Sequence, residues 1–470
     1  MRWGSLLALV CSACAGTACV SAADEHAAAR ERVDAHLQER LGVTPHTTAS
    51  EAEVQERVQQ LLHDGLSEAE AAQLALSVQR SVQARLASLG AGAAEFAQAM
   101  LWANPVLGGD LVWMDGGTEV ELSLAQPLAD ILLAPLRRAK GGAELRALEA
   151  EVTASVVDAV FHARRAHVAA RLAQQELDLI TAQLGTARAA ESLMQDLAEA
   201  GNITPVELAH ARAEAERWEQ TRAEAERDWW AAREVLNRAT GLWGVHTQWV
   251  LAVETPRDPL ADEPNATVDL TGVEARVVQA SLELAAARSR MEAQAHSAGI
   301  QEWSTILPDA QLGLAAKKDA DDASWGLGPA GAVALPLLDA GSTANYAAQA
   351  RLQALAEQYW SLAVDLRSAA RTARERLRGY SYAARHARTV LVPAERSVVE
   401  ETLRNFNAMQ IGAFDVLVAR RNELAAERRA VQLEAAAHQA RLDLDELLAG
   451  HWSRSRTELS NKEPSDEHHP

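Results

Sequence analysis

The stretch Thr118-Glu119-Val120-Glu121-Leu122-Ser123-Leu124 decides which kind of fold this sequence specifies. Apolar and polar side chains alternate strictly along it, which places the valine and leucines on one face and the glutamates and serine on the other. This period of two is typical of a β-strand whose two faces meet different surroundings. The polar turn Asp115-Gly116-Gly117 precedes the stretch, so we expect a pair of short strands at about residues 106–126.

A second pair of short strands is expected at about residues 309–335. Its apolar positions alternate with small or polar residues and are Leu312, Leu314, Trp325, Leu327, Val333 and Leu335. An apolar face opposite a polar or small face is the pattern of a barrel wall between lipid and lumen. Four strands cannot close a barrel, so other copies of the chain would supply the missing strands. Hairpins packed against the helices of a soluble protein are the alternative.

The rest of the chain is predicted to be mostly α-helical. A set of apolar positions is spaced by four and seven residues, which is the heptad period of a coiled coil. These positions are Val157, Phe161, Val168, Leu172 and Leu179. A helix from Arg138 to Ala200 would be about 95 Å long at 1.5 Å per residue. That length indicates long coiled-coil hairpins rather than a globular domain, with a soluble helical bundle as the alternative.

The same order of elements occurs twice along the chain. The segment from Val206 to Arg212 is similar to the segment from Phe414 to Arg420, and Asp415 lies 208 residues after Glu207 (415 − 207). Three further pairs of segments keep nearly the same spacing: Asn104-Pro105 with Leu307-Pro308, Gln126-Pro127-Leu128 with Leu335-Pro336-Leu337, and Thr240-Gly241 with Ala449-Gly450. We infer a duplicated unit of about 200 residues, and we expect each copy to end at a glycine that stops a helix.

The composition argues against several classes of function. The chain has 470 residues, with 45 Lys and Arg against 65 Asp and Glu, for a formal net charge of −20. Because it has no basic excess to neutralise phosphates, we expect no nucleic-acid partner. Beyond residue 22, no segment offers 18 uncharged apolar residues, so the sequence predicts no membrane-spanning helix.

The first 22 residues are predicted to be an export signal, because a short apolar run follows Arg2 and small residues follow the run. All three cysteines lie in this segment, at Cys11, Cys14 and Cys19. Cleavage before Cys19 or Cys14 would give a lipid-anchored protein, whereas cleavage after Ala22 would give an unmodified exported one. The sequence leaves both outcomes open. A mature chain without thiols suits an oxidising compartment.

These patterns divide the chain into six parts. We expect a signal at 1–22, an N-terminal extension at 23–50, a first repeat at 51–241, a linker at 242–272, a second repeat at 273–450 and a disordered acidic tail at 451–470.

Taken together, the motifs resemble the TolC family of outer-membrane efflux proteins, and within it the CzcC-like heavy-metal branch. The resemblance runs from about Glu51 to Gly450, which is nearly all of the mature chain. It is carried, in order, by Ala71-Ala72-Gln73-Leu74-Ala75-Leu76, Leu89-Gly90-Ala91-Gly92-Ala93, Asn104-Pro105, Gln126-Pro127-Leu128, Ala200-Gly201-Asn202-Ile203-Thr204, Leu307-Pro308-Asp309 and Phe406-Asn407-Ala408-Met409-Gln410-Ile411-Gly412.

The resemblance implies a homotrimer whose twelve strands form one β-barrel in the bacterial outer membrane, in contact with its lipid. The helices would extend far into the periplasm as an α-helical barrel, and would meet a periplasmic adaptor (membrane fusion protein) and an inner-membrane RND-type pump. Such a channel passes pumped metal ions or small toxic molecules outward; it is not an enzyme and needs no cofactor. A type I protein-secretion exit duct and a periplasmic coiled-coil scaffold without a pore are the alternatives.

The resemblance also implies a periplasmic gate lined by acidic residues. Asp415 stands where the family has a gate carboxylate in the second repeat, and Glu207 stands at the related position of the first. A ring of three carboxylates would attract cations, whereas each acid would otherwise serve to cap a helix start. TolC has a second acid three residues after this position, but this chain has Val418. The tips that contact the adaptor would be Gly201-Asn202-Ile203 and Gln410-Ile411-Gly412, which are otherwise simple hairpin turns.

No catalytic or metal-binding set is predicted from spacing. The sequence offers no thiol cluster, no phosphate loop and no zinc-protease helix. His162 and His167 are five residues apart, so they do not stack on a helix as metal ligands would, and we expect both on a solvated face.

Overall fold

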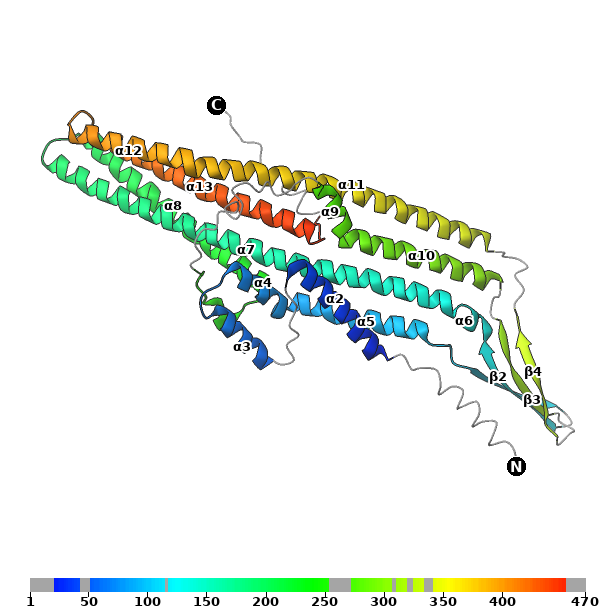
Figure 1. Cartoon of the computed structure of the whole chain (residues 1–470). Helices are drawn as coiled ribbons and strands as arrows, with labels where there is room; N and C mark the ends of the chain where they lie inside the picture. Colours follow the sequence, from blue (N-terminus) through cyan, green and yellow to red (C-terminus); the bar gives the residue numbers. More distant parts are fainter. Residues whose placement is uncertain are drawn as a thin grey trace. The chain divides into compact units, whose positions relative to one another are not determined.

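The computed structural model describes residues 21–42, 51–114, 117–252, 272–306, 310–318, 324–333 and 341–453. Residues 1–20 of the predicted signal, with Cys14 and Cys19, lie outside these residues, as do Leu335 and residues 454–470 of the predicted tail. Figure 1 shows long helices and one small sheet, so the predicted mostly α-helical fold with a small β part is confirmed. The chain divides into two compact units, which we call the sheet unit (1–36, 85–153 and 282–363) and the tip unit (37–84, 154–281 and 364–470).

The sheet unit contains all four described strands. They are β1 (Val106–Met114), β2 (Gly117–Pro127), β3 (Gln311–Lys318) and β4 (Gly326–Ala332). They pair antiparallel in the order β1-β2-β3-β4, so β1 and β4 are the edge strands. The helices of this unit are α6 (Leu128–Leu132) and α10 (Leu282–Ile306), most of α2 (Ala22–Leu41) and α5 (Arg80–Met100), and the first parts of α7 (Ala134–Glu199) and α11 (Ser342–His386).

The register gives this sheet one apolar face and one polar face, as the alternation predicted. The apolar face carries Leu107, Leu111, Trp113, Val120, Leu122, Leu124, Leu312, Leu314 and Leu327. The other face carries mainly polar or small residues, and Lys317 Nζ lies there 2.5 Å from Glu119 Oε1. Leu107, Trp113 and Leu327 are 75%, 77% and 67% exposed, so the described part of the chain leaves the apolar face uncovered.

Small residues allow the helices of the sheet unit to pack closely. A side chain at Gly141 would come within 3.2 Å of both Phe96 and Ala99, so α5 and α7 approach each other at this glycine. A charged pair also lies in this packing, because Arg32 Nη2 on α2 is 2.6 Å from Oε1 of the buried Glu149 on α7. The alanine-rich composition therefore serves close helix packing rather than a core of large rings.

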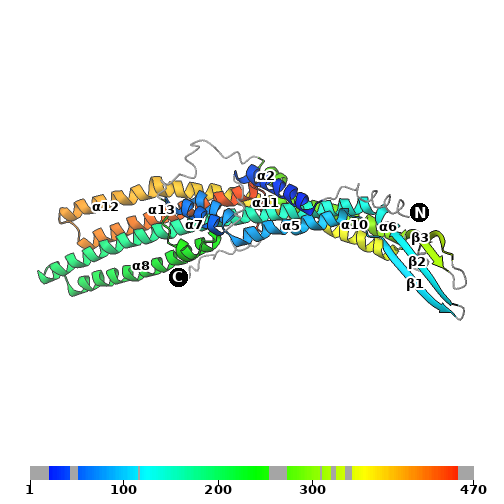
Figure 2. The same cartoon turned by 90° about the horizontal axis from the view of Figure 1, so that it is seen from below.

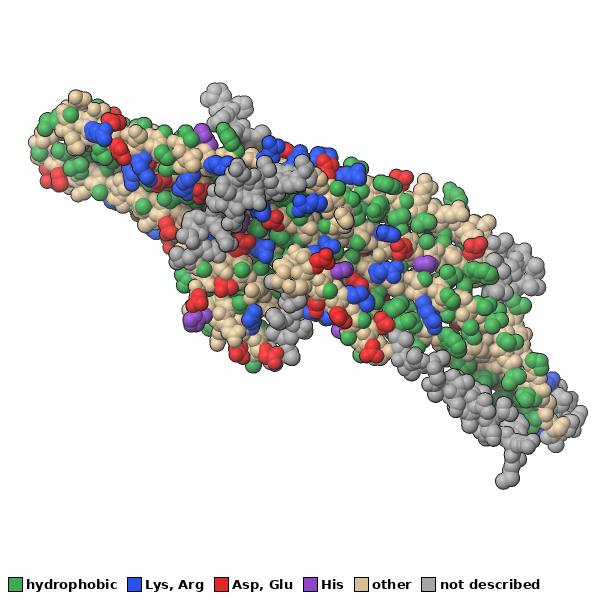
Figure 3. All heavy atoms as spheres, viewed as in Figure 1, with side chains coloured by type: hydrophobic (Ala, Val, Ile, Leu, Met, Phe, Trp, Pro, Cys, Tyr) green, Lys and Arg blue, Asp and Glu red, His purple; other side chains and the backbone are tan. Residues whose placement is uncertain are grey.

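The tip unit consists of helices, including the later parts of α7 and α11. Its other elements are α3 (Glu51–Leu62), α4 (Glu68–Ser77), α8 (Pro205–Thr240), the 3₁₀ turn η1 (Gly244–Thr247), α9 (Val273–Ala280), the π-helical turn η2 (Ala387–Leu391), α12 (Val392–Asn407) and α13 (Ala413–Leu448). Figures 1 and 2 both show α12 and α13 side by side as a hairpin. Charged side chains of both signs are dispersed over the helices in Figure 3. Among the described residues, no helix is both long and apolar enough to span a membrane.

The helices of the two hairpins match at the offset found between the sequence motifs. The start and the end of α13 lie 208 residues after those of α8 (413 − 205 and 448 − 240). The run from Ser342 to Asn407 is likewise displaced by 208 residues from α7 (342 − 134 and 407 − 199). Gly241 (φ 78°) and Gly450 (φ 95°) follow the ends of α8 and α13 in left-handed conformations, as predicted for the stop signals. The compact units cut across this repeat, because each contains segments of both halves.

The predicted heptad stripe of α7 holds over its first three positions in the tip unit. Val157, Phe161 and Val168 are buried, whereas Leu172 and Leu179 are only half-buried and Ile180 is buried in place of the last. An α-helix has 3.6 residues per turn, so a strict seven-residue repeat drifts around it, and the buried position moves by one residue. The stripe is therefore a local seam rather than a sustained heptad.

Candidate functional site

The first predicted tip joins α7 to α8 through a turn held by local hydrogen bonds. Gly201 has a φ of 76°, which suits glycine, and the Asn202 N–H donates to Leu197 O at 2.8 Å. Glu207 then forms a capping box: its carboxylate accepts from the Thr204 N–H at 2.7 Å and from the Thr204 hydroxyl at 2.8 Å. These two bonds lower the pKa of Glu207. Glu207 therefore caps α8, and its role in a gate remains a prediction.

The second predicted tip joins α12 to α13 and is capped less completely. Met409 adopts a left-handed conformation (φ 58°) that is uncommon for a residue with a side chain, and it is 93% exposed. The Gln410 N–H donates to Asn405 O at 3.0 Å, and the Gly412 N–H donates to Asp415 Oδ2 at 3.1 Å. Gly412 has no side chain to return a bond, so Asp415 forms only half of a capping box.

A cavity of about 130 Å³ lies where α7, α8 and α13 meet near the tips. Glu207, Phe414 and Val418 are among the residues that line it. The structure therefore brings the Glu207 side of the first tip to the start of α13, but Asp415 is not among the lining residues. Val418, which occupies the place of an acid in TolC, gives this cavity an apolar wall instead.

The two histidines considered in the sequence have different surroundings. His162 is exposed, as expected. The expectation was wrong for His167, which is 3% exposed and whose Nε2 lies 3.0 Å from Leu66 O. The carbonyl comes from the segment between α3 and α4, so the spacing of residues along α7 gave no sign of this partner. His167 is thus a buried, hydrogen-bonded residue of the core.

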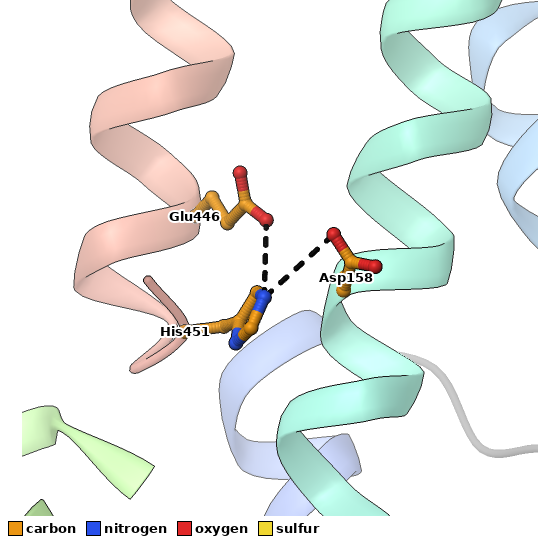
Figure 4. A group of neighbouring side chains, drawn as sticks. All are labelled: Asp158, Glu446 and His451. Atoms are coloured by element: carbon orange, nitrogen blue, oxygen red, sulfur yellow. Dashed lines mark ion pairs between the residues drawn. The ribbon is translucent and has the colours of Figure 1, made fainter. Parts of the chain in front are cut away.

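Three ligand-type side chains that are far apart in the sequence meet between α7 and the end of α13 (Figure 4). Nε2 of His451 lies 3.6 Å from Oδ1 of Asp158 and 3.9 Å from Oε1 of Glu446. One ligand atom from each residue lies within 4.8 Å of the other two. Glu446 is buried, and Asp158 and His451 are partly buried. The sequence did not predict this cluster, which we call the α7–α13 cluster.

The backbone after α13 explains why His451 reaches this position. Gly450 lies in the left-handed region, and the His451 N–H donates to Glu446 O at 3.1 Å, which closes the helix end. A side chain at Gly450 would collide with Arg40 and with the carbonyl oxygen of Ala280. Nη1 of Arg40 itself donates to Ala280 O and Ala449 O, both at 2.7 Å. The turn is therefore fixed from both sides, although sequence prediction placed His451 in the tail.

Arg165 supplies the main positive charge beside the α7–α13 cluster. Its Nη1 donates to Glu446 Oε2 at 2.6 Å and to Asp443 Oδ1 at 3.0 Å. Burial nevertheless raises the pKa of Glu446 to about 7, because it outweighs the favourable charges of Arg165 and His451. Burial also opposes the charge on Asp158, but the hydrogen bond and charge of His451 outweigh it and lower the pKa of that carboxyl.

Comparisons with known proteins agree with this architecture. No protein-family model matches the sequence. The chain is 25% identical over 311 residues to the cobalt-zinc-cadmium resistance protein CzcC of Cupriavidus metallidurans, covering 65% of this chain and 69% of that protein. The fold matches CusC, studied for its folding and transmembrane channel formation, with a TM-score of 0.68 and 15% identity over 84% of this chain and 92% of that one. It also matches the open MtrE outer membrane channel of Neisseria gonorrhoeae, with a TM-score of 0.64 and 16% identity over 85% and 90% of the chains.

The fold and the sequence together define an outer-membrane channel rather than an enzyme. Within that class, the chain has the fold of the CusC and MtrE channels and is similar in sequence to CzcC. The resemblance found in the motifs is therefore confirmed, and so is the predicted location in the outer membrane.

Proposed function

We propose that three copies of this chain form one duct that passes metal ions or small toxic molecules through the outer membrane. The observation that carries this proposal is a four-stranded sheet with an exposed apolar face and two edge strands. Lipid is a favourable neighbour for such a face, but an open strand edge in lipid leaves backbone groups without hydrogen bonds. Pairing β4 of each copy with β1 of the next closes twelve strands and removes every edge.

The polar face of the sheet would then line the lumen. It carries Asp110, Glu119 and Glu121, with Lys317 as the opposing charge, and glycine and alanine fill much of the remaining surface. A lumen with more carboxylates than amines suits the passage of cations. The name of the CzcC relative, a cobalt-zinc-cadmium resistance protein, also supports metal ions as the cargo.

The hairpin tips would contact a periplasmic adaptor, which joins the duct to an inner-membrane RND-type pump. Exposed Met409 and Gln410 with half-buried Ile411 offer a contact surface at the second tip. Gly201, Asn202 and Ile203 provide the corresponding surface at the first tip. Energy for transport would come from the pump, because the proposed duct performs no covalent chemistry.

Disulfide trapping between copies tests the proposed closure of the sheet. The chain has no cysteine after Cys19, so no native thiol in the strands or helices would compete with a disulfide between engineered cysteines. We expect Val112→Cys on β1, combined with a scan of β4 from Gly326→Cys to Ala330→Cys, to give a trimer-sized product in outer membranes. Ser123→Cys on the interior strand β2, combined with the same scan, is the matched control and should give none. A monomer released by osmotic shock, with no cross-linked product, would contradict the duct.

Planar-bilayer recordings test the proposed gate. Asp415→Asn removes one carboxylate from each copy, and we expect weaker cation preference because a ring of three charges is lost. Glu207→Gln is the comparison, and we expect a smaller change because Glu207 stands only at the related position of the first repeat. Unchanged selectivity in Asp415→Asn would remove this residue from the gate while leaving the duct itself intact.

A further inference from the structure

The α7–α13 cluster combines an imidazole and two carboxylates whose ligand atoms converge (Figure 4). We propose that Asp158, Glu446 and His451 form a resident binding site for one divalent transition-metal ion of the zinc type. The proposal goes beyond the efflux route. The site lies at the C-terminal end of α13, whereas the proposed gate residue Asp415 lies at the start of that helix.

Two of the three distances between ligand atoms are close to those that zinc requires, and the third pair, Asp158 and Glu446, lies within 4.8 Å. Ligand atoms placed about 2.0–2.1 Å from a tetrahedral ion lie about 3.4 Å from one another. The imidazole nitrogen is 3.6 Å from the Asp158 oxygen and 3.9 Å from the Glu446 oxygen. Shifts of about half an ångström would therefore bring these pairs to a tetrahedral spacing. An imidazole with carboxylate ligands and no thiolate suits zinc and its first-row neighbours better than soft ions.

The two oxygens of Glu446 have separate partners, which leaves one directed toward the site. Oε2 accepts from Arg165, whereas Oε1 is the atom that faces His451. Arg165 also pairs with Asp443, and Arg376 lies at the neighbouring cavity. A divalent cation would interact favourably with the carboxylates of Asp158 and Glu446 in this partly buried site.

Space for a further ligand lies beside the cluster. A cavity of about 70 Å³ is bordered by Asp443, Glu446, His451 and Trp452. A water molecule occupies about 30 Å³, so the cavity can hold a water that completes a four-coordinate ion. The fixed turn at Gly450 holds His451 in place before the metal arrives. Bound metal would then link α7 directly to the segment that follows α13.

Cobalt binding to the purified full-length chain tests this site. After removal of metal with a chelator, Co²⁺ is titrated and its visible d–d absorption is recorded, and Zn²⁺ is then added as a competitor. We expect one equivalent per chain with four-coordinate absorption that Zn²⁺ displaces. Asp158→Asn and His451→Gln should each weaken binding at least about tenfold. Full-strength binding in both variants would overturn the proposal.

Two controls separate this site from other histidines. His438 lies on α13, and its Nε2 is 2.9 Å from Oε2 of Glu68 rather than near the cluster. His438→Gln therefore removes a histidine that is not part of the proposed site. His468→Gln with His469→Gln removes the histidine pair near the C-terminus. Both should bind Co²⁺ like the unmodified chain, and an equal loss in either would place the metal elsewhere. X-ray absorption on the unmodified chain with Zn²⁺ needs no variant: one imidazole per zinc supports the site, and none overturns it.

Discussion

The two helical hairpins of the tip unit have equal lengths but differ at equivalent positions. Gly185 in α7 and Pro393 in α12 are 208 residues apart (393 − 185), so each hairpin carries a helix-breaking residue at the same place. Helix α7 passes Gly185 as regular α-helix, whereas the π turn η2 (Ala387–Leu391) precedes Pro393. Proline lacks an N–H and crowds the carbonyl four residues earlier, and a π turn relieves such a conflict. The two hairpins therefore have the same length although one passes the equivalent position as regular α-helix and the other passes it through a π turn.

The hairpins also differ at both ends of their shorter helices. Thr204 and Glu207 form a full capping box on α8, whereas Gly412 and Asp415 form half of one on α13. After Gly241 the chain leads to Trp249, whose Nε1 donates to Asn237 Oδ1 at 2.7 Å inside an apolar core. After Gly450 it leads instead to His451 and a charged cluster. The two equivalent backbone turns therefore lead to different surroundings: the first leads to a tryptophan in an apolar core, and the second leads to a histidine among charged side chains.

Gly185→Pro should have the largest effect, because it places a proline where the helix has no π turn. We expect a loss of about 3 kcal/mol in the free energy of unfolding, measured as a lower thermal midpoint by circular dichroism. Gly185→Ala is the control, and it should gain up to about 1 kcal/mol because the site has open space and alanine favours a helix. If the proline variant is as stable as the unmodified chain, α7 can form a π turn of its own and the two hairpins are alike here.

Gly241→Ala and Gly450→Ala should have the next largest effects. Both residues are left-handed, and a Cβ at Gly241 would lie 2.9 Å from the Gln79 backbone. We expect each change to cost about 1–3 kcal/mol in thermal unfolding. Gly201→Ala separates the cost of a left-handed φ from the cost of steric contact. Gly201 has a left-handed φ but open space around it, so only about 1 kcal/mol should be lost there. Equal losses at all three glycines would show that steric contact contributes nothing.

Exchanging the caps of the two tips should have a smaller effect. Thr204→Ala removes the side chain that bonds the Glu207 N–H, and we expect local destabilisation of about 1 kcal/mol. Gly412→Ser supplies the missing half of the second box, and we expect a gain of a few tenths of a kcal/mol. Hydrogen exchange in peptides covering each tip measures both changes. Slower exchange in Thr204→Ala would contradict the capping role.

The smallest effect is expected from pH at the first tip. The folded pKa of Glu207 is lowered by its bonds from Thr204, so the cap contributes fully above the ordinary value of 4.5 and is lost as pH falls through the lowered pKa. Hydrogen exchange at this tip should therefore increase at acidic pH beyond its intrinsic change. Glu207→Gln should show no such additional step. The same step in that variant would assign the pH response to another group.

The sequence predicted the features that local chemistry sets. Alternation along Thr118–Leu124 gave the strand and its faces, and the glycines at 241 and 450 gave the helix ends, because both depend on neighbouring residues. The π turn before Pro393 was not predicted, because a proline can also kink or end a helix. The α7–α13 cluster was not predictable from spacing: Asp158 and His451 come together only through the packing of α7 against α13. The histidine after Gly450 was the one available signal.

The unequal edges of the sheet have a genetic consequence. Pairing β4 of one copy with β1 of the next is a head-to-tail contact, so every copy in the proposed trimer must provide both edges for the ring to close. One copy with a defective β4 would leave a gap that its two intact partners cannot fill. If half of the chains carried the defect, only about one trimer in eight would be complete. A damaged β4 allele should therefore be dominant over the intact gene.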